Sequence, residues 1–270
     1  MLFLFITLCN LLVFKAIFDG HLSNHFKLLY WVSMAMGILV KGPIILIFTI
    51  LPLLALSIIQ KRNFFNFIWT KYGFFIFFLI SVPWFVLISI KSNGLFWHES
   101  VINDLFNKVR SGQESHGFVP GYYTLLIFLF FWPGSIFIPS FFINLKIKFK
   151  EYFIKNNLNC FLILYFLLPF VLYEVIPTKL PHYIFPSYVA LSILISKEII
   201  SSNFKSSLLK YAFLPTVIFP LTIMSVITFA IYEYSSFDTF FFLIILTFLS
   251  FLFLLIFFLK KKKIKNILYV

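Results

Sequence analysis

Charged residues are scarce in this sequence: 11% of its 270 residues are Asp, Glu, Lys or Arg, whereas 61% are hydrophobic. Soluble domains average roughly 25% charged residues, so this chain has too few polar groups to cover a water-facing surface. The two cysteines, Cys9 and Cys160, lie in or beside apolar runs and provide neither a disulfide framework nor a zinc motif. The sequence also has no P-loop, no Gly-x-Ser-x-Gly and no His-Glu-x-x-His. Together these absences leave a membrane protein whose chemistry does not rest on a standard soluble-enzyme motif.

The sequence is instead rich in long apolar runs. A hydrocarbon core of about 30 Å requires about 20 apolar residues per helix. Runs near this length lie at 2–18, 43–60, 72–90, 121–143, 158–176, 184–200, 208–232 and 237–259, and a shorter run lies at 28–40. We therefore expect an all-α polytopic membrane protein with about 8–9 transmembrane helices. No internal repeat or flexible linker divides the chain, so residues 1–270 are expected to form a single transmembrane domain.

The 22 lysines and arginines are distributed unevenly among the linkers. Most lie in the linkers 60–71, 144–157 and 197–210 and in the tail 260–270, which share one side if the segments alternate. The positive-inside rule assigns this side to the cytoplasm, together with the C-terminus. The lysines of the tail are expected to anchor on anionic lipid, and nucleic acid is not an expected partner because no contiguous basic face is present.

The same topology places the loop 92–120 on the extracytoplasmic side, where it begins with an amphipathic pattern over Leu95–Arg110. Apolar residues recur every four positions, and polar residues occupy the opposite face. This pattern predicts an amphipathic helix lying in the membrane interface. Taken alone, the segment is explained equally well as a solvated surface helix without chemistry.

A polar cluster follows that helix. Glu114 and His116 lie within five residues, just before Pro120-Gly121-Tyr122-Tyr123 begins the next helix. Such a cluster at the lipid surface is costly unless it meets a polar ligand.

Two further polar segments are expected on the same side. In Pro177–Tyr183 two prolines exclude a regular helix, so Lys179 and His182 can be presented towards a phosphate. Lys41 is followed by Gly42-Pro43 between two apolar runs, and snorkelling alone would also explain it.

Five motifs link these segments: KGP at 41–43, PWF at 83–85, FWHES…DLFNKVRSGQESHGFVPGYY across 96–123, FWPGS at 131–135 and PTKLPHYIFPSY at 177–188. Together they resemble bacterial membrane glycosyltransferases related to protein O-mannosyltransferases and to lipid A aminoarabinose transferase. The resemblance extends from about residue 30 to 190, and the His116 and TKLPHY stretches are its most specific parts.

The resemblance implies a GT-C-like bundle in the bacterial inner membrane, with its site on the extracytoplasmic side. Such hexosyl- or pentosyltransferases move a sugar, with inversion, from a polyprenyl-phosphate donor to a lipid or protein acceptor, as in lipopolysaccharide modification or protein glycosylation.

The physical needs of this reaction assign roles to particular residues. The leaving phosphate needs cations, for which Lys41, Arg110, Lys179 and His182 are available. Glu114 and His116 are the candidate catalytic residues, since the acceptor hydroxyl needs a general base. Trp97, Tyr122 and Tyr123 are candidates to line the path of the lipid carrier and sugar. His116 is also a candidate ligand for a divalent metal, although two such side chains do not define a metal site. No other cofactor is expected.

One departure from the family qualifies this interpretation. Members of the family begin with a helix and a large extracytoplasmic loop. That loop holds an acidic pair, to which the role of general base is assigned, and this chain starts too late to contain the loop. The sequence therefore resembles the second part of a longer enzyme, with Asp19 expected in the cytoplasm. Glu99, Asp104 and Glu114 are the acids that remain for the base. The alternatives are a transporter or lipid flippase, and a catalytically inactive remnant.

Overall fold

The computed structural model describes residues 1–100, 103, 120–132, 134–200, 245, 249 and 253. Within these residues the chain is helical and contains no strand, which confirms the predicted all-α class. The helices and helical turns are α1 (Leu2–Asp19), α2 (Asn24–Lys41), α3 (Ile44–Ile59), η1 (Phe64–Phe67), α4 (Lys71–Lys91), α5 (Leu95–Trp97), α7 (Tyr122–Phe130), η3 (Gly134–Phe137), α8 (Ile138–Ile147), η4 (Glu151–Lys155), α9 (Asn157–Val175), η5 (Pro181–Ile184) and α10 (Phe185–Ile200).

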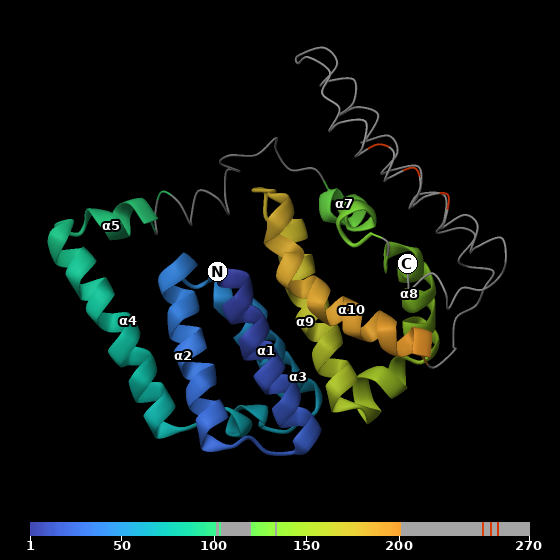
Figure 1. The fold of residues 1–270 in the computed structure, drawn as a ribbon, viewed down its shortest axis with the longest axis horizontal. Coiled ribbons are helices and arrows are strands. Elements are labelled where there is room, and N and C mark those ends of the chain that lie inside the picture. Colours follow the sequence, from blue (N-terminus) through green and yellow to red (C-terminus); the bar gives the residue numbers. More distant parts are fainter. Residues whose placement is uncertain are drawn as a thin grey trace, which may run out of the picture. The chain divides into compact units, whose positions relative to one another are not determined.

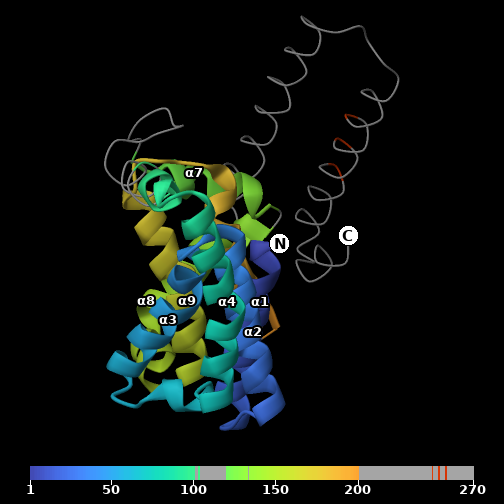
Figure 2. The same cartoon turned by 90° about the vertical axis from the view of Figure 1, so that its left-hand side faces the viewer.

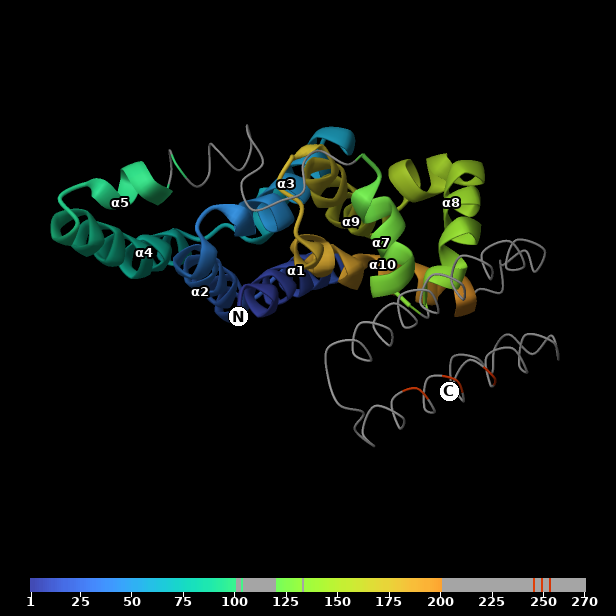
Figure 3. The ribbon, with the colours of Figure 1, turned by 90° about the horizontal axis from the view of Figure 1, so that it is seen from above.

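The chain divides into two compact units. The first comprises Met1–Leu126 and Phe142–Lys197, and the second comprises Ile127–Phe141 and Glu198–Val270. In the first unit α2 packs against both α1 and α4, and α3 packs against α9 (Figures 1 and 2). Viewed from above, α4, α2 and α1 lie in one row and α3 and α9 in a second (Figure 3). The single domain expected over 1–270 stays a prediction, because most of the second unit lies outside the described residues.

Four described segments are long and apolar enough to cross a membrane: Leu2–Asp19, Lys71–Lys91, Asn157–Val175 and Pro181–Ile200. Each coincides with a run expected from the sequence. The expected runs at 28–40 and 43–60 are also helical, as α2 and α3, and α3 has 16 residues. The runs at 208–232 and 237–259 fall almost entirely outside the described residues.

The run at 121–143 differs from the prediction, because it is not one helix. Helix α7 ends at Phe130, a turn follows at Phe131 and Trp132, and the chain resumes as η3 and then α8. The sequence supplies the reason. The FWPGS motif places Pro133 and Gly134 in the middle of the run, and these are the two residues that most disfavour a helix interior.

The helices of the first unit alternate in direction, as the topology argument requires. At one end, the side-chain amide of Gln60 donates to the carbonyl of Phe153 at 2.5 Å, which joins the 60–71 linker to η4. At the other end, Lys41 meets Tyr183. The two groups of linkers that the sequence assigned to opposite sides therefore lie at opposite ends.

In the core of the first unit, a polar side chain on α1 forms a hydrogen bond to the backbone of α3. The buried Asn10 donates through Nδ2 to the carbonyl of Phe48 at 3.1 Å. In a regular helix that carbonyl would receive the N–H of residue 52, but residue 52 is proline and has none. Asn10 thus replaces the bond that Pro52 removes from α3, which is how an apolar bundle accommodates a helix-breaking residue.

Helix α4 is held mainly through its first half. The ring of Trp31 on α2 forms edge contacts with Phe74 and Phe77, at 5.5 and 5.8 Å between centroids. Gly73 makes this approach possible, because a Cβ there would stand 2.2 Å from Cδ1 of Trp31. Only Gly73 and Ser81 of α4 are buried, so the second half of the helix has little protein around it.

Candidate functional site

A cavity of about 270 Å³ opens at the end of the first unit where Lys41 and Tyr183 meet. Its lining comes from the N-terminus and α1, the end of α2, α3, α9, η5 and α10: Met1, Leu2, Phe3, Lys41, Ile44, Phe48, Tyr173, His182, Tyr183, Phe185 and Pro186. Most of these side chains are apolar or aromatic, and two, Lys41 and His182, are basic. A small apolar cavity with a few polar groups at one edge is the usual form of a ligand site.

Lys41 is presented by the turn between α2 and α3. Gly42 follows it with φ +64°, a backbone conformation that glycine adopts without strain, and Pro43 precedes the first residue of α3. This tight turn leaves the Lys41 side chain exposed, with its ammonium 4.8 Å from the centre of the Tyr183 ring. The contact lies within the range of a cation–π interaction.

His182 and Tyr183 are presented by the 177–183 segment. Ile176 and Leu180 are extended, and Pro181 starts η5, so the backbone turns sharply between α9 and α10, as the two prolines predicted. His182 is exposed, and the ring of Tyr183 lies 5.4 Å from that of Tyr173 on α9. Tyr173 stacks in turn on Phe48, at 5.9 Å between ring centroids. This aromatic series joins the turn to α9 and α3.

Lys179 does not line the cavity. Its side chain is 6% exposed, and its ammonium donates to the carbonyl of Tyr173 at 3.0 Å and to that of Glu174. These carbonyls belong to the last turn of α9, where no further helical N–H can reach them. Desolvation lowers the pKa of the Lys179 amine below its ordinary 10.5, and the carboxylate of Glu174 acts in the opposite direction.

Tyr123 lies beside Lys179, and its ring centre is 5.4 Å from the ammonium. The fully buried Tyr123 donates its hydroxyl proton to the carbonyl of Leu180 at 2.9 Å and accepts from the N–H of Leu180 at 3.2 Å. Its own backbone N–H donates to the carboxylate of Glu174 at 3.0 Å. Tyr123 therefore fixes the Leu180 turn and does not line the cavity that holds Lys41.

Glu174 was not among the residues predicted from the sequence, because it stands inside the apolar run 158–176. A lone carboxylate in such a run is itself a signal, since ionisable groups at membrane depth are expensive and usually paired. Tyr173 was not predicted either, since its aromatic neighbours in a Phe-rich sequence gave no reason to select it.

The other aromatic residues predicted for the carrier path have different surroundings. The indole N–H of Trp97 donates to the hydroxyl of Ser89 at 2.6 Å, and its ring stacks on Phe85 at 5.6 Å. Trp97 thus packs on α4. Tyr122 contacts the ring of Tyr123 at 5.0 Å and is half-buried.

The predicted interfacial helix is described only at its start. Leu95–Ser100 is helical, and Asn103 donates to the carboxylate of Glu99 at 3.0 Å, a spacing that fits one helical turn. Arg110, Glu114 and His116, with Asp104, lie outside the described residues. Their predicted roles in binding phosphate, in catalysis and in holding a metal stay predictions.

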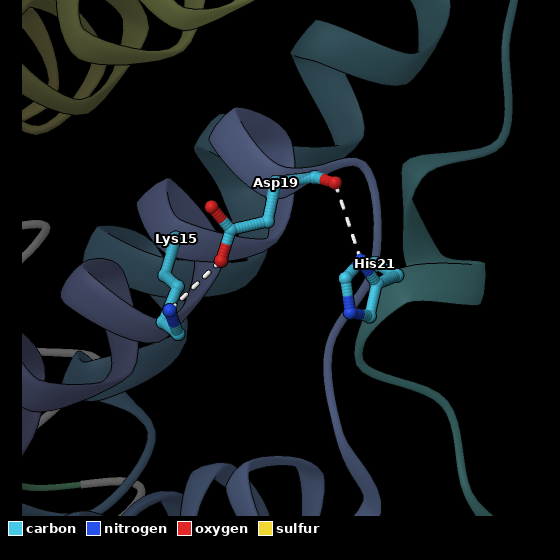
Figure 4. Close-up of polar contacts among 3 residues, drawn as sticks. All are labelled: Lys15, Asp19 and His21. Carbon is cyan, nitrogen blue, oxygen red and sulfur yellow. Dashed lines mark hydrogen bonds and ion pairs between the residues drawn. The ribbon is translucent and has the colours of Figure 1, made fainter.

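Asp19 lies at the opposite end of the first unit from the cavity. Its carboxylate pairs with Lys15 at 2.8 Å, and its backbone carbonyl meets the imidazole of His21 at 3.2 Å (Figure 4). This position removes Asp19 from consideration as a base at the cavity, and its cytoplasmic location stays a prediction. Among the described residues, no three His, Cys, Asp or Glu side chains come together as metal ligands.

Two known proteins are similar to this chain. The undecaprenyl phosphate-α-4-amino-4-deoxy-L-arabinose arabinosyl transferase 1 of Pseudomonas fluorescens is 26% identical over 175 residues, which cover 62% of this chain and 30% of the relative. The crystal structure of ArnT from Cupriavidus metallidurans bound to undecaprenyl phosphate superposes with a TM-score of 0.60 at 18% identity, over 84% of this chain and 40% of that one. No family model matches the sequence.

The fold defines a class: within the described residues the chain is an all-helical membrane protein with several candidate spans and a GT-C-like fold. Within that class it is related in sequence and structure to the lipid A aminoarabinose transferases, which confirms the predicted relationship. The chain spans about a third of the length of its curated relative.

Proposed function

We propose that this chain takes part in transferring a sugar from a polyprenyl-phosphate donor to an acceptor at the extracytoplasmic face of the bacterial inner membrane. One observation carries the proposal: the cavity combines apolar and aromatic walls with two basic side chains, Lys41 and His182. A polyprenyl phosphate has the same two parts, an apolar chain and an anionic head. Support also comes from the two relatives, whose names specify an undecaprenyl-phosphate sugar and bound undecaprenyl phosphate.

In the proposed reaction an acceptor hydroxyl attacks the anomeric carbon of the sugar as the bond from that carbon to the phosphate oxygen breaks. The polyprenyl phosphate departs with both bonding electrons, and its negative charge grows in the transition state. Lys41 is placed to stabilise that charge, which is where a fixed cation lowers a barrier most. The imidazole N–H of His182 can donate a hydrogen bond to the same phosphate. The proton of the acceptor goes to a general base, for which Glu114 and His116 remain our candidates.

The fit of the cavity favours a lipid-linked donor over a soluble nucleotide sugar. A nucleotide sugar carries two phosphates and a polar base, and these would need more polar partners than this lining provides. The acceptor is proposed to be a lipid, as in lipopolysaccharide modification, with a protein acceptor as the second option. Neither similar protein is described as a transporter or lipid flippase.

The proposal is tested with the purified full chain in lipid nanodiscs. We would supply undecaprenyl-phosphate aminoarabinose and lipid A and follow product formation by mass spectrometry. Transfer that is abolished by Lys41→Gln supports the proposal. Absence of transfer, together with equal affinity for polyprenyl phosphate and polyprenol, contradicts it. Transbilayer movement of the lipid without sugar transfer would instead identify a flippase.

A further inference from the structure

Three residues form a closed set of contacts beside the cavity. The carboxylate of Glu174 binds the backbone N–H of Tyr123, the hydroxyl of Tyr123 binds both backbone groups of Leu180, and the ammonium of Lys179 binds the carbonyl of Glu174. We call Tyr123, Glu174 and Lys179 the clasp. It joins the start of α7, the end of α9 and the turn that leads into η5.

The contacts of Glu174 and Lys179 satisfy backbone groups at helix ends that have no helical partner. The N–H of Tyr123 belongs to the first turn of α7, where no helical carbonyl is available and where a negative charge is favoured by the helix dipole. The carbonyls of Tyr173 and Glu174 belong to the last turn of α9, where a cation is favoured for the same reason. The clasp therefore uses one acidic side chain to cap the start of α7 and one basic side chain to cap the end of α9.

The turn held by the clasp carries the groups of the cavity. Leu180 is followed directly by Pro181 and His182, and Tyr183 then meets Lys41. Lys179 also holds the backbone of Tyr173, whose ring contacts Tyr183. Loosening the clasp would therefore shift both His182 and the ring that Lys41 contacts.

We propose that the clasp positions the cavity's basic pair, Lys41 and His182, and that Lys179 acts on the turn and not on the donor phosphate itself. The inference rests on the proposed function, and it reassigns Lys179 from phosphate ligand to positioning residue. The geometry supports this reassignment, because the ammonium is buried against two carbonyls and a ring and is absent from the cavity lining.

The decisive variant is Tyr123→Phe, which removes the hydroxyl contacts to Leu180 without changing any charge. We would measure the affinities of the full chain in nanodiscs for undecaprenyl phosphate and for undecaprenol, at a temperature where every variant is folded. The ratio of these affinities is the phosphate preference. Tyr123→Phe, Lys179→Gln and Glu174→Ala are each expected to lower it about 3- to 10-fold, which corresponds to typical coupling within one network.

The double variant Tyr123→Phe/Lys179→Gln separates the two roles of Lys179. If Lys179 acts through the clasp, the double variant loses no more phosphate preference than Lys179→Gln alone. If Lys179 binds the phosphate directly, either Tyr123→Phe alone leaves the preference unchanged, or its loss multiplies with that of Lys179→Gln in the double variant. Either result overturns the proposal. Glu174→Gln keeps an oxygen that can accept from the Tyr123 N–H, so it is expected to stay within about 2-fold of the wild type.

Lys197→Gln is the matched control. Lys197 also forms a hydrogen bond, to the side-chain oxygen of Asn159 at 2.7 Å, but at the other end of α9. It is expected to keep the phosphate preference even if it lowers the melting temperature. Clasp variants that lower the melting temperature and keep the preference would show a purely structural clasp and overturn the proposal.

The same data distinguish a failure of the proposed function from a failure of the clasp. A wild-type chain without phosphate preference contradicts the proposed function and, with it, the positioning role. If the melting-temperature shifts of Tyr123→Phe and Lys179→Gln add up in the double variant, the two residues are not coupled. That result contradicts the clasp, whatever ligand the chain binds.

Discussion

The ammonium of Lys41 lies 4.8 Å from the centre of the Tyr183 ring, although the two residues are separated by most of the described chain. The contact brings together the KGP turn and the TKLPHY segment, which the sequence could only assign to the same side of the membrane. Since both residues line one cavity, the phosphate of a lipid carrier that enters it would meet Lys41 beside an aromatic ring.

Replacing Lys41 tests this arrangement directly. We expect Lys41→Gln to weaken binding of undecaprenyl phosphate by about 10- to 100-fold, because a charge-assisted hydrogen bond contributes about 1.5–3 kcal/mol. Binding of undecaprenol should change little. Lys15→Gln is the control, since it also removes a lysine from the first unit but at the Asp19 end. Equal losses for the phosphate and the alcohol would show that Lys41 acts on the fold and not on the phosphate.

Asn10 and Pro52 offer a test of the packing that supports the cavity. Asn10→Leu is expected to lower the free energy of unfolding by about 1–2 kcal/mol, because it leaves the Phe48 carbonyl without a donor. In a Pro52→Ala background, residue 52 regains its N–H and can bind that carbonyl. Asn10→Leu should then cost less than half as much. Thermal unfolding in detergent measures the stability of the four proteins of this cycle. If Asn10→Leu lowers the free energy of unfolding equally in both backgrounds, the Asn10 side chain does not replace the missing helical hydrogen bond.

Gly73 is expected to be intolerant of larger side chains. Gly73→Val would place carbon atoms where the ring of Trp31 now lies, and overpacking of this kind costs about 1–3 kcal/mol. The indole fluorescence of the variant should shift as Trp31 is displaced. Tyr72→Val serves as the control, because Tyr72 is the neighbouring residue and is 77% exposed. A Gly73→Val variant as stable as this control would mean that α4 does not depend on the close contact.

The lowered pKa of Lys179 predicts a pH dependence with a definite sign. The unfolded chain keeps the Lys179 proton up to about pH 10.5, whereas the folded chain releases it at lower pH. Between these two pKa values the unfolded state binds more protons, so the free energy of unfolding rises with pH. Lys179→Gln should abolish this contribution. Glu174→Gln should extend it to lower pH, because the carboxylate opposes the shift. Unfolding titrations from about pH 8 to 10.5 measure both slopes, and a slope that is unchanged in Lys179→Gln would assign the dependence to another group.

The sequence predicted the elements of the fold more completely than their contacts. Apolar runs and basic linkers were sufficient for α1, α3, α4, α9 and α10 and for the alternation of their ends, because the membrane imposes both length and charge distribution. Pro133-Gly134 indicates the break between α7 and α8, but the surrounding run is so hydrophobic that it was predicted as one helix. Hydrophobicity alone does not report where a helix stops.

The candidate site was predicted in part. Lys41 and His182 were selected as cations on one side, and the structure brings both to one cavity. Lys179 and Tyr123 were selected for the ligand, yet their contacts are with backbone groups of α9 and Leu180. The sequence alone does not distinguish a lysine that binds a phosphate from one that binds helix carbonyls, since Lys41 and Lys179 both lie two residues from a proline. Glu174 was missed because its partner, the N–H of Tyr123, is 51 residues away.

Helix α4 is fastened near Trp31 and has little protein around its second half, and Pro83 stands between these two regions. The proline removes the bond that the carbonyl of Leu79 would otherwise receive, so resistance to bending is lowest there. Bending at this point would tilt the last two turns of α4 and carry α5 with them, since Trp97 stacks on Phe85. Pro83 is therefore where we expect α4 to bend, and the part of α4 beyond it leads into the start of the 92–120 loop.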